Sequence, residues 1–526
     1  MEDFPWLSVL IALPALGALL VGVLPRAGEA LVKQVALGVS LLVAAGTVAM
    51  TAAFDTGGPR FQFEEKYDWI PQFGVHWALG VDGVALVLVL LSVILVPLVI
   101  LASWNEADRS GGVDVPAKRS VKTYFALLLA LEAMMIGVFA ATDVFLFYVF
   151  FEAMLIPVYF LIGSYGGAQR SYAAVKFLLY SLFGGLLMLV AVLWLYPLSA
   201  KPVGEGGLGH GTFLFSELST MDIDPTTAKW LFLGFFIAFA IKAPMVPVHT
   251  WLPDAAQQAP AGALVLIVGV LDKVGTYGML RFCLELFPGA SKWATPVVLG
   301  FAVLSIVYGA VLAIGQVDLK RLVAYTSISH FGFIVLGIFA MTTAAQSGAA
   351  LYMVNHGFST GALFLLVGFM IVRRRSARIG DYGGVQKVAP VLAGTFLVAG
   401  LSGLSLPGLS PFVSEFLVFT GTFARYKVPA VIATIAIVLA AIYILWMYQR
   451  TMGGPVAEGA KGMKDLSGRE KLAIGPIIAI IIALGFFPQP LLNVINPSVE
   501  KTLVRVDQRD PAPEITGNVA ENGARP

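Results

Sequence analysis

The sequence predicts an all-α, polytopic membrane protein, and three observations carry that prediction. Hydrophobic residues make up 58% of the 526 residues and charged residues only 13%, about half of the roughly 25% usual in soluble domains. The mean hydropathy is +0.84. Apolar stretches of about 20 residues, enough for a helix to cross a bilayer, recur along the whole chain. The net charge of +2 is too small to indicate a nucleic-acid partner.

The apolar stretches predict about 14 transmembrane helices of about 20 residues each. We expect the spans near 6–24, 31–54, 82–102, 122–141, 143–164, 174–199, 229–252, 261–287, 293–314, 319–341, 349–372, 388–424, 429–450 and 471–495. Polar stretches at 55–81, 103–121, 201–228 and 451–470 separate some of them. The tail at 496–526 is rich in Pro, Glu, Asn and Gly, and we expect it to be mobile or to lie against a partner.

The distribution of Lys and Arg predicts the orientation. Basic residues gather in the loops after the odd-numbered spans, for example at Arg373, Arg374 and Arg375. The positive-inside rule makes these loops cytoplasmic and places both termini outside the cytoplasm.

The N-terminus is acidic and resembles no cleavable signal. A single cysteine, Cys283, excludes an internal disulfide framework, an iron–sulfur cluster and a thiolate zinc site. These features fit a bacterial plasma membrane.

Two patterns suggest cofactor or metal sites and are set aside. GEGGLG at 204–209 matches G-x-G-x-x-G, but that pattern indicates a dinucleotide site only between a strand and a helix of a βαβ unit. Here it lies in a loop between two predicted spans. The five histidines show neither H-x-x-x-H nor H-E-x-x-H spacing. We therefore expect no cofactor-binding residue and no metal ligand in this chain.

Ionisable side chains inside the spans are more informative, because a charge near the bilayer centre costs about 2.5–3.5 kcal/mol. They are Glu132 (span 4), Glu152 (span 5), Lys242 (span 7), Asp272 and Lys273 (span 8), His330 (span 10), His356 (span 11) and Glu415 (span 12). A single buried Glu or His often makes no more than an interhelical hydrogen bond. So many on neighbouring spans, accompanied by Ser, Thr and Asn, favour an ion or proton path.

Prolines interrupt two of these spans beside a charged residue. Pro244 and Pro247 follow Lys242 in span 7, and Pro407 and Pro411 precede Glu415 in span 12. A proline kink that serves packing alone explains either span by itself. Two broken spans at matching positions instead indicate inverted repeats with a site near the midplane. Spans 4–8 and 9–13 then form two five-helix repeats of inverted topology.

This division predicts four regions. They are 1–121 (three N-terminal spans and loops), 122–287 (first five-helix repeat), 288–450 (second five-helix repeat) and 451–526 (last span and polar tail).

Several long sequence segments resemble those of one protein family. IKAPMVPVHTWLPDA, LDKVGTYGMLRF, YTSISHFGF, NHGFSTGALFL and LPGLSPFVSEF are similar to the antiporter-like membrane subunits of respiratory complex I and of multisubunit cation/proton antiporters. The resemblance is close over spans 4 to 13. Family members of the L and N type usually carry lysine on the broken twelfth span and the M type carries glutamate. Glu415, together with FLFYVFFEAMLIPVYFLIG around Glu152, resembles the M type.

The resemblance implies roles for the charged residues. Glu152 and Lys242 would be a coupled ion pair, and Lys273 a central relay. His330 and His356 would lead onward to Glu415, from which the proton leaves, with Glu132 and Asp272 as further proton-transfer candidates. The usual WLPDAH is WLPDAA here, so Ala256 stands in place of a histidine.

The resemblance also implies a proton-translocating subunit of NADH–quinone oxidoreductase. NADH, FMN, iron–sulfur clusters and quinone would be handled by other subunits, and the neighbours would be L-type and N-type membrane subunits. Three alternatives stay open: a subunit of a cation (Na⁺ or K⁺)/proton antiporter, a stand-alone transporter of an organic solute, and a spacer that does not pump.

The energy of an ion pair is large enough to drive the movement of one proton against the membrane potential. Two charges about 4 Å apart at an effective dielectric near 20 interact by about 4 kcal/mol. Moving one charge against about 150–200 mV costs about 3.5–4.6 kcal/mol. Because the two magnitudes match, opening and closing the pair of Glu152 and Lys242 could load and eject one proton.

Overall fold

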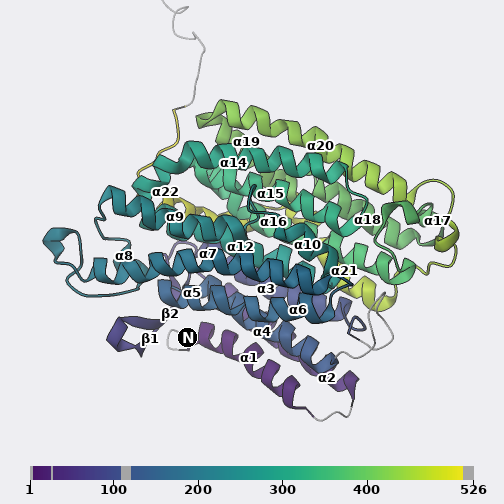
Figure 1. Ribbon diagram of the computed structural model, residues 1–526, viewed down its shortest axis with the longest axis horizontal. Helices are drawn as coiled ribbons and strands as arrows, with labels where there is room; N and C mark the ends of the chain where they lie inside the picture. The colour runs from purple at the N-terminus through teal and green to yellow at the C-terminus, as the bar shows by residue number, and fades with distance from the viewer. Residues whose placement is uncertain (1–3, 25–27, 108–119, 513–526) are drawn as a thin grey trace, which may run out of the picture.

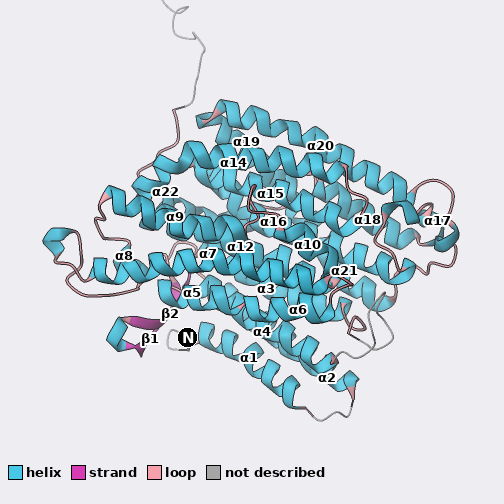
Figure 2. Ribbon diagram, viewed as in Figure 1, coloured by secondary structure: helices cyan, strands magenta, loops and turns pink. Residues whose placement is uncertain are grey.

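The computed structural model describes residues 4–24, 28–107 and 120–512 as a bundle of long helices with one small hairpin (Figures 1 and 2). Figure 1 shows α1 and α2 along one edge and α20 along the opposite edge, with the chain crossing between them in sequence order. The last helices do not extend this row, because α21 and α22 return to pack against α3 and α16.

The N-terminal region holds two peripheral helices, a hairpin and a central helix. Its elements are α1 (Trp6–Val23), α2 (Glu29–Ala52), β1 (Gln62–Ile70), η1 (Pro71–Phe73), β2 (Val75–Val81) and α3 (Gly83–Ala102). The antiparallel hairpin turns at Gly74, whose φ of 61° lies in the left-handed region that favours glycine. The sequence-based expectation of a polar loop at 55–81 and of an all-α chain missed this hairpin.

The next region follows the first predicted repeat. It contains α4 (Val121–Ala140), α5 (Val144–Ala153), α6 (Leu155–Tyr165), α7 (Arg170–Ser199), η2 (Val203–Glu205), α8 (Phe215–Leu218), α9 (Pro225–Lys242), α10 (Trp251–Gln258), α11 (Ala261–Leu266), η3 (Ile267–Leu271), α12 (Asp272–Gly278), η4 (Met279–Cys283) and α13 (Leu284–Leu286). Span 5 is thus two helices, α5 and α6. Span 8 runs as one path in which η3 and η4 are π-helical turns. The G-x-G-x-x-G match at 204–209 lies in the loop around η2, not between a strand and a helix.

The following helices occupy the stretch predicted as the second repeat. They are α14 (Pro288–Ile314), α15 (Leu319–Ala340), α16 (Thr343–Arg374), η5 (Ile379–Asp381), α17 (Val385–Val388), α18 (Pro390–Gly403), α19 (Ser410–Arg425) and α20 (Lys427–Met452). Both predicted interruptions are present. The seventh span stops as a helix at Lys242 and resumes at Trp251, and the twelfth stops at Gly403 and resumes at Ser410.

The C-terminal region differs from the expectation of one span followed by a mobile tail. After η6 (Glu458–Ala460), α21 (Gly468–Phe486) and α22 (Gln489–Val506) meet at a bend of 71°. The expectation was wrong for 496–506, which is helical because Val499, Leu503 and Val506 bury one face of α22. The rest of the predicted tail beyond 512 lies outside the described residues.

A buried ion pair fixes the loop before α21. Both guanidinium nitrogens Nη1 and Nη2 of Arg373 bond the two carboxylate oxygens of Glu470, at 2.8 and 2.6 Å. Burial works to raise the pKa of nearby Asp465, but backbone N–H donors from Val391 and Leu392 hold that pKa below its usual value. Part of the basic cluster at 373–375 therefore has a structural role in this loop.

Aspartates start several of the long helices. Asp82, Asp143, Asp224 and Asp318 each accept hydrogen bonds from backbone N–H groups in the first turn of α3, α5, α9 and α15, respectively. This is the preferred N-cap chemistry, and it satisfies donors that the helix itself leaves free.

Among the described residues, 11 helices are long and apolar enough to cross a membrane, or 12 if α21 and α22 are one span. The interrupted segments α9 and α18–α19 are not among the 11. The multi-span membrane architecture is confirmed, while the total of 14 stays a prediction.

Candidate functional site

Four of the charged residues lie on the three helical paths that are most enclosed by the rest of the protein. The most apolar windows of Ala261–Leu286, Leu319–Ala340 and Thr343–Arg374 are 100%, 94% and 94% buried, against 33% for α1 and 33% for α20. These three interior paths carry Asp272, Lys273, His330 and His356. Helices that faced only lipid would not need such groups, so the charges belong to the interior of the bundle.

Lys242 sits at the end of α9, where Pro244 and Pro247 prevent the helix from continuing. Its side chain is buried, and its ammonium lies over the rings of Phe151 (5.3 Å) and Phe177 (5.6 Å). Among the described residues, Lys242 Nζ has no hydrogen-bond partner. A cation over aromatic faces recovers part of the lost hydration energy but leaves all three N–H donors available.

Glu152 lies close to Lys242 without a direct ion pair. Glu152 is on α5, and its Oε1 atom also has no hydrogen-bond partner. Among the described residues, no ion pair within 4.0 Å joins the two groups, although each acts electrostatically on the other. Gly185 of α7 makes room for the carboxylate, since a Cβ there would overlap Glu152 Oε1. The pair is therefore open in this structure.

Asp272 interacts electrostatically with both central lysines, Lys242 and Lys273. It is fully buried on α12, and within the part of the chain that the structure describes neither of its carboxylate oxygens has a hydrogen-bond partner. Sequence reasoning left open whether Asp272 pairs with a lysine or points elsewhere. Its interaction with both lysines makes it a member of the same electrostatic group.

Lys273 is held by two close contacts. Lys273 Nζ donates to the Val268 carbonyl at 2.5 Å and lies 2.6 Å from His356 Nδ1. Val268 belongs to the π-helical turn η3. A π-helical turn departs from the regular α-helical ladder and often marks a functional site. Lys273 thereby reaches across to α16, which carries His356.

The two histidines, His356 and His330, lie next to each other beyond Lys273. The ring of His356 lies edge-on to that of His330, with 5.2 Å between centroids, and His356 Nε2 lies 3.1 Å from Ser327 Oγ. Because Nδ1 of His356 faces Lys273 and Nε2 faces Ser327, the imidazole can take a proton on one side and release it on the other.

Glu415 accepts two side-chain hydrogen bonds at the interrupted twelfth span. The Tyr352 hydroxyl donates to Glu415 Oε2 at 3.2 Å, and the Ser405 hydroxyl donates to the same oxygen. Asn355 Nδ2 donates to the Ser410 carbonyl at 2.7 Å and so ties α16 to the start of α19. The break in the helix leaves these carbonyl and hydroxyl groups free to form the site.

Sequence reasoning pointed to Ser327 as a polar neighbour of the buried histidines, but it missed the two hydroxyl donors of Glu415, Tyr352 and Ser405. A signal for Tyr352 was present: it precedes His356 by four residues, so the two share one helix face.

Glu132 differs from the other predicted proton-transfer residues. Its side chain is fully buried on α4, and among the described residues its carboxylate has no hydrogen-bond partner and forms no ion pair with the other groups. Its role in proton transfer stays a prediction.

Clusters of ion pairs lie at both ends of the predicted first repeat. Asp254 of α10 pairs with Lys176 of α7 at 2.7 Å and with Arg321 of α15 at 2.8 Å. At the hairpin end, Asp82 pairs with Arg281 at 2.5 Å, and Glu285 pairs with Arg60. Ala256 is buried in α10.

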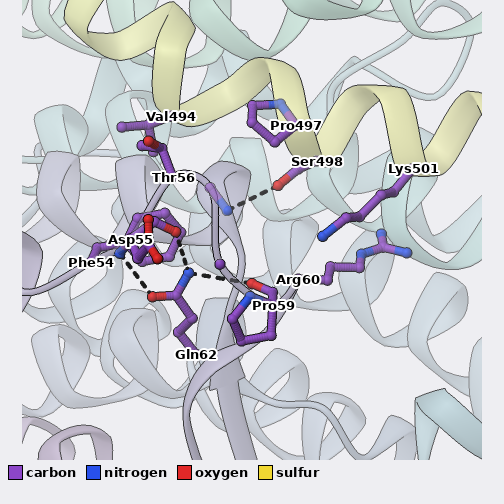
Figure 3. Close-up of a pocket in the computed structure, with 12 residues that line it drawn as sticks. Phe54, Asp55, Thr56, Pro59, Arg60, Gln62, Val494, Pro497, Ser498 and Lys501 are labelled. Atoms are coloured by element: carbon purple, nitrogen blue, oxygen red, sulfur yellow. Dashed lines mark hydrogen bonds between the residues drawn. The ribbon is translucent and has the colours of Figure 1, made fainter.

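A small pocket near the hairpin lies between the loop before β1 and α22 (Figure 3). Arg60, Gln62, Ser498 and Lys501 line it, and the Gly83 amide donates to Ser498 Oγ at 3.0 Å beside it. Its volume is about 10 Å³, about enough for one water molecule. This pocket does not fit the roomy substrate site that a transporter of organic solutes needs.

The described residues contain no group of three or more His, Cys, Asp or Glu side chains placed to hold a metal ion. The site is instead a row of single protonatable groups. Such a row binds no large ligand, but it can pass protons between groups through hydrogen bonds and intervening water.

The chain is similar to known proteins over most of its length. The family model described as NADH:quinone oxidoreductase/Mrp antiporter, TM, matches residues 141–440. An NADH-quinone oxidoreductase subunit M of Mycobacterium tuberculosis (strain CDC 1551 / Oshkosh) is 50% identical over 552 aligned residues, which cover 100% of this chain and 98% of that relative.

Two solved structures are similar in fold. A chain of respiratory complex I from Thermus thermophilus with bound NADH is 32% identical, with a TM-score of 0.84 over 95% of this chain and 99% of that one. A chain of the Mrp complex from Dietzia sp. DQ12-45-1b is 20% identical, with a TM-score of 0.81 over 96% and 100%. The second likeness is evidence of shared fold alone.

Proposed function

Since the chain belongs to the family of NADH:quinone oxidoreductase and Mrp antiporter membrane subunits, we propose that it is the M-type, proton-translocating subunit of the membrane arm of NADH–quinone oxidoreductase. The observation that carries the proposal is the buried contact from Lys273 through His356 to His330, with the Lys242 group on one side and Glu415 on the other. Protons move along this line, and the redox chemistry takes place in other subunits.

The open pair of Glu152 and Lys242 is the switch of this mechanism. When the two groups approach to about 4 Å, their attraction of about 4 kcal/mol favours a protonated Lys242. When they separate further, this attraction weakens, while the burial of Lys242 continues to disfavour its charge. Asp272 lies within electrostatic reach of both lysines, so the released proton moves toward Lys273.

From Lys273 the proton passes to the histidines and then toward Glu415. Lys273 Nζ is already within hydrogen-bond distance of His356 Nδ1, so this step needs no large motion. Glu415 is the last acceptor, held by two hydroxyl donors at the interrupted twelfth span. The membrane potential sets the energy scale, about 3.5–4.6 kcal/mol per charge at about 150–200 mV.

The surroundings of the chain are part of the proposal. Flavin, iron–sulfur clusters, NADH and quinone belong to other subunits, and L-type and N-type membrane subunits flank this one. The Lys- and Arg-rich loops face the cytoplasm of a bacterial plasma membrane, with both termini on the other side. A cation/proton antiporter subunit is the less favoured function, because the full-length likeness of 50% is to an NADH-quinone oxidoreductase subunit and position 415 is glutamate.

The test is Lys242→Ala in the assembled enzyme, reconstituted into vesicles. We expect NADH-driven proton uptake to fall about 100-fold or more, as for the loss of a proton-transfer group. Lys229→Ala is the matched control: it lies on the same helix, but its ammonium rests over Trp293 at 5.1 Å. Full pumping by the Lys242→Ala enzyme would exclude the proposed mechanism.

A further inference from the structure

Tyr352 is a buried tyrosine in the middle of the proposed path. It lies on α16, which packs against both α15 and α19. Its side chain is fully buried. A buried phenol needs a hydrogen-bond partner, because an unsatisfied hydroxyl in an apolar interior costs free energy.

The partner of this hydroxyl is the carboxylate at the end of the line. Tyr352 Oη donates to Glu415 Oε2 at 3.2 Å. The side chain of Ser405 donates to the same oxygen and so completes a three-residue polar group. A tyrosine hydroxyl both donates and accepts, so it can give up its own proton to Glu415 while receiving another.

The ring of Tyr352 faces the histidines on its other side. Its centroid lies 5.9 Å from that of His330 and 6.4 Å from that of His356. Among the described residues, neither histidine forms a hydrogen bond or an ion pair with Glu415. Tyr352 is thus the residue that contacts both the histidine pair and the terminal carboxylate.

We infer that Tyr352 is a relay residue that carries the proton from His330 to Glu415. The inference rests on the proposed function and extends it by one named step. The O–H bond of Tyr352 breaks as its proton forms a new O–H bond on Glu415 Oε2. A proton from the His330 side, delivered directly or through one water, then forms a new O–H bond on Tyr352, which ends unchanged.

The first variant for the test is Tyr352→Phe in the assembled enzyme, reconstituted into vesicles. It keeps the ring, and with it the packing on both histidines, and removes only the hydroxyl. We expect NADH-driven proton uptake to fall about 100-fold, the usual scale for a positioned proton-transfer group. NADH oxidation by an artificial electron acceptor should be unchanged. Tyr448→Phe is the control, because that hydroxyl donates to a backbone carbonyl, Ala393 O, at 3.3 Å.

A second variant separates relay from packing. Tyr352→His replaces the phenol by another ring that can donate and accept, and we expect at least about a tenth of the pumping to return. A purely structural role predicts the reverse order, with Phe tolerated and His harmful. Wild-type pumping by Tyr352→Phe would overturn the relay, as would equal loss in both variants or failure of both to assemble.

The outcome can be told apart from failure of the proposed function. Normal pumping by Lys242→Ala contradicts the whole path. Normal pumping by Tyr352→Phe, together with loss of pumping by Lys242→Ala, excludes the relay role of Tyr352 but does not contradict the rest of the proton path.

Discussion

Replacing Gly275 by alanine tests whether the spacing between the two central lysines matters. Gly275 lies on α12, two residues after Lys273, where α12 packs on the end of α9. A Cβ at Gly275 would lie 2.5 Å from the Phe239 carbonyl oxygen, 2.6 Å from the Ala243 amide nitrogen and 2.8 Å from Ala243 Cβ. Two of these are backbone atoms, so a side-chain rotation cannot remove the overlap.

The size of the effect follows from these distances. Ordinary contacts between such atoms need about 3.5 Å, so the end of α9 must move away from α12 by about 1 Å. Overpacking of this kind costs about 1–3 kcal/mol of stability. Ala243 follows Lys242 directly, so the same displacement moves Lys242 relative to Asp272 and Lys273. Misplacing a reacting group by about 1 Å costs about 100-fold in rate.

The assay is NADH-driven proton uptake by reconstituted enzyme, together with its thermal unfolding. Gly300→Ala on α14 is the matched control, since a Cβ there meets nothing within 4 Å. We expect the control to pump normally and to be stabilised by up to about 1 kcal/mol, the helix preference of alanine over glycine. If Gly275→Ala pumps and melts like the unmodified enzyme, the spacing argument is refuted.

Two further substitutions test the charge clusters at the ends of the first repeat. Arg281→Ala leaves Asp82 buried without its closest cation and should destabilise the protein by about 3–5 kcal/mol, measured as a lower melting temperature. The exposed pair of Lys292 with Asp507 is the comparison, and Lys292→Ala should cost at most about 1 kcal/mol. Asp254→Asn removes the shared partner of Lys176 and Arg321 and should lower stability by about 1–2 kcal/mol. An Asp254→Asn enzyme that resists heat and detergent as well as the original would show that these pairs do not hold α10 in place.

Much of the architecture is readable from the sequence because the bilayer imposes a simple pattern. Helices must be about 20 apolar residues long, and prolines beside a charge mark where a helix is interrupted. Both interruptions, after Lys242 and before Ser410, were predicted from Pro244, Pro247, Pro407 and Pro411. The hairpin at 62–81 was missed because its first strand is mostly exposed and polar, and because distant residues such as Asp143 help to hold the second strand in place.

The candidate site was predictable residue by residue but not contact by contact. Insertion cost alone singles out buried charges such as Lys273 and His356. It cannot say that Lys273 bonds His356 and a π-helical carbonyl, because that contact depends on a turn that departs from regular helix geometry. Polar residues such as Tyr352 carry no comparable insertion cost, so sequence reasoning passed over them. The ion pair expected between Glu152 and Lys242 is open, which hydropathy cannot reveal.

The most direct test is a map of the assembled enzyme in a lipid bilayer at a resolution that places ordered water. The account predicts water molecules joining Glu152 to Lys242, Asp272 to Lys273, and His330 through Tyr352 to Glu415. A map in which packed apolar side chains fill those three gaps, so that no water joins neighbouring groups, would contradict it.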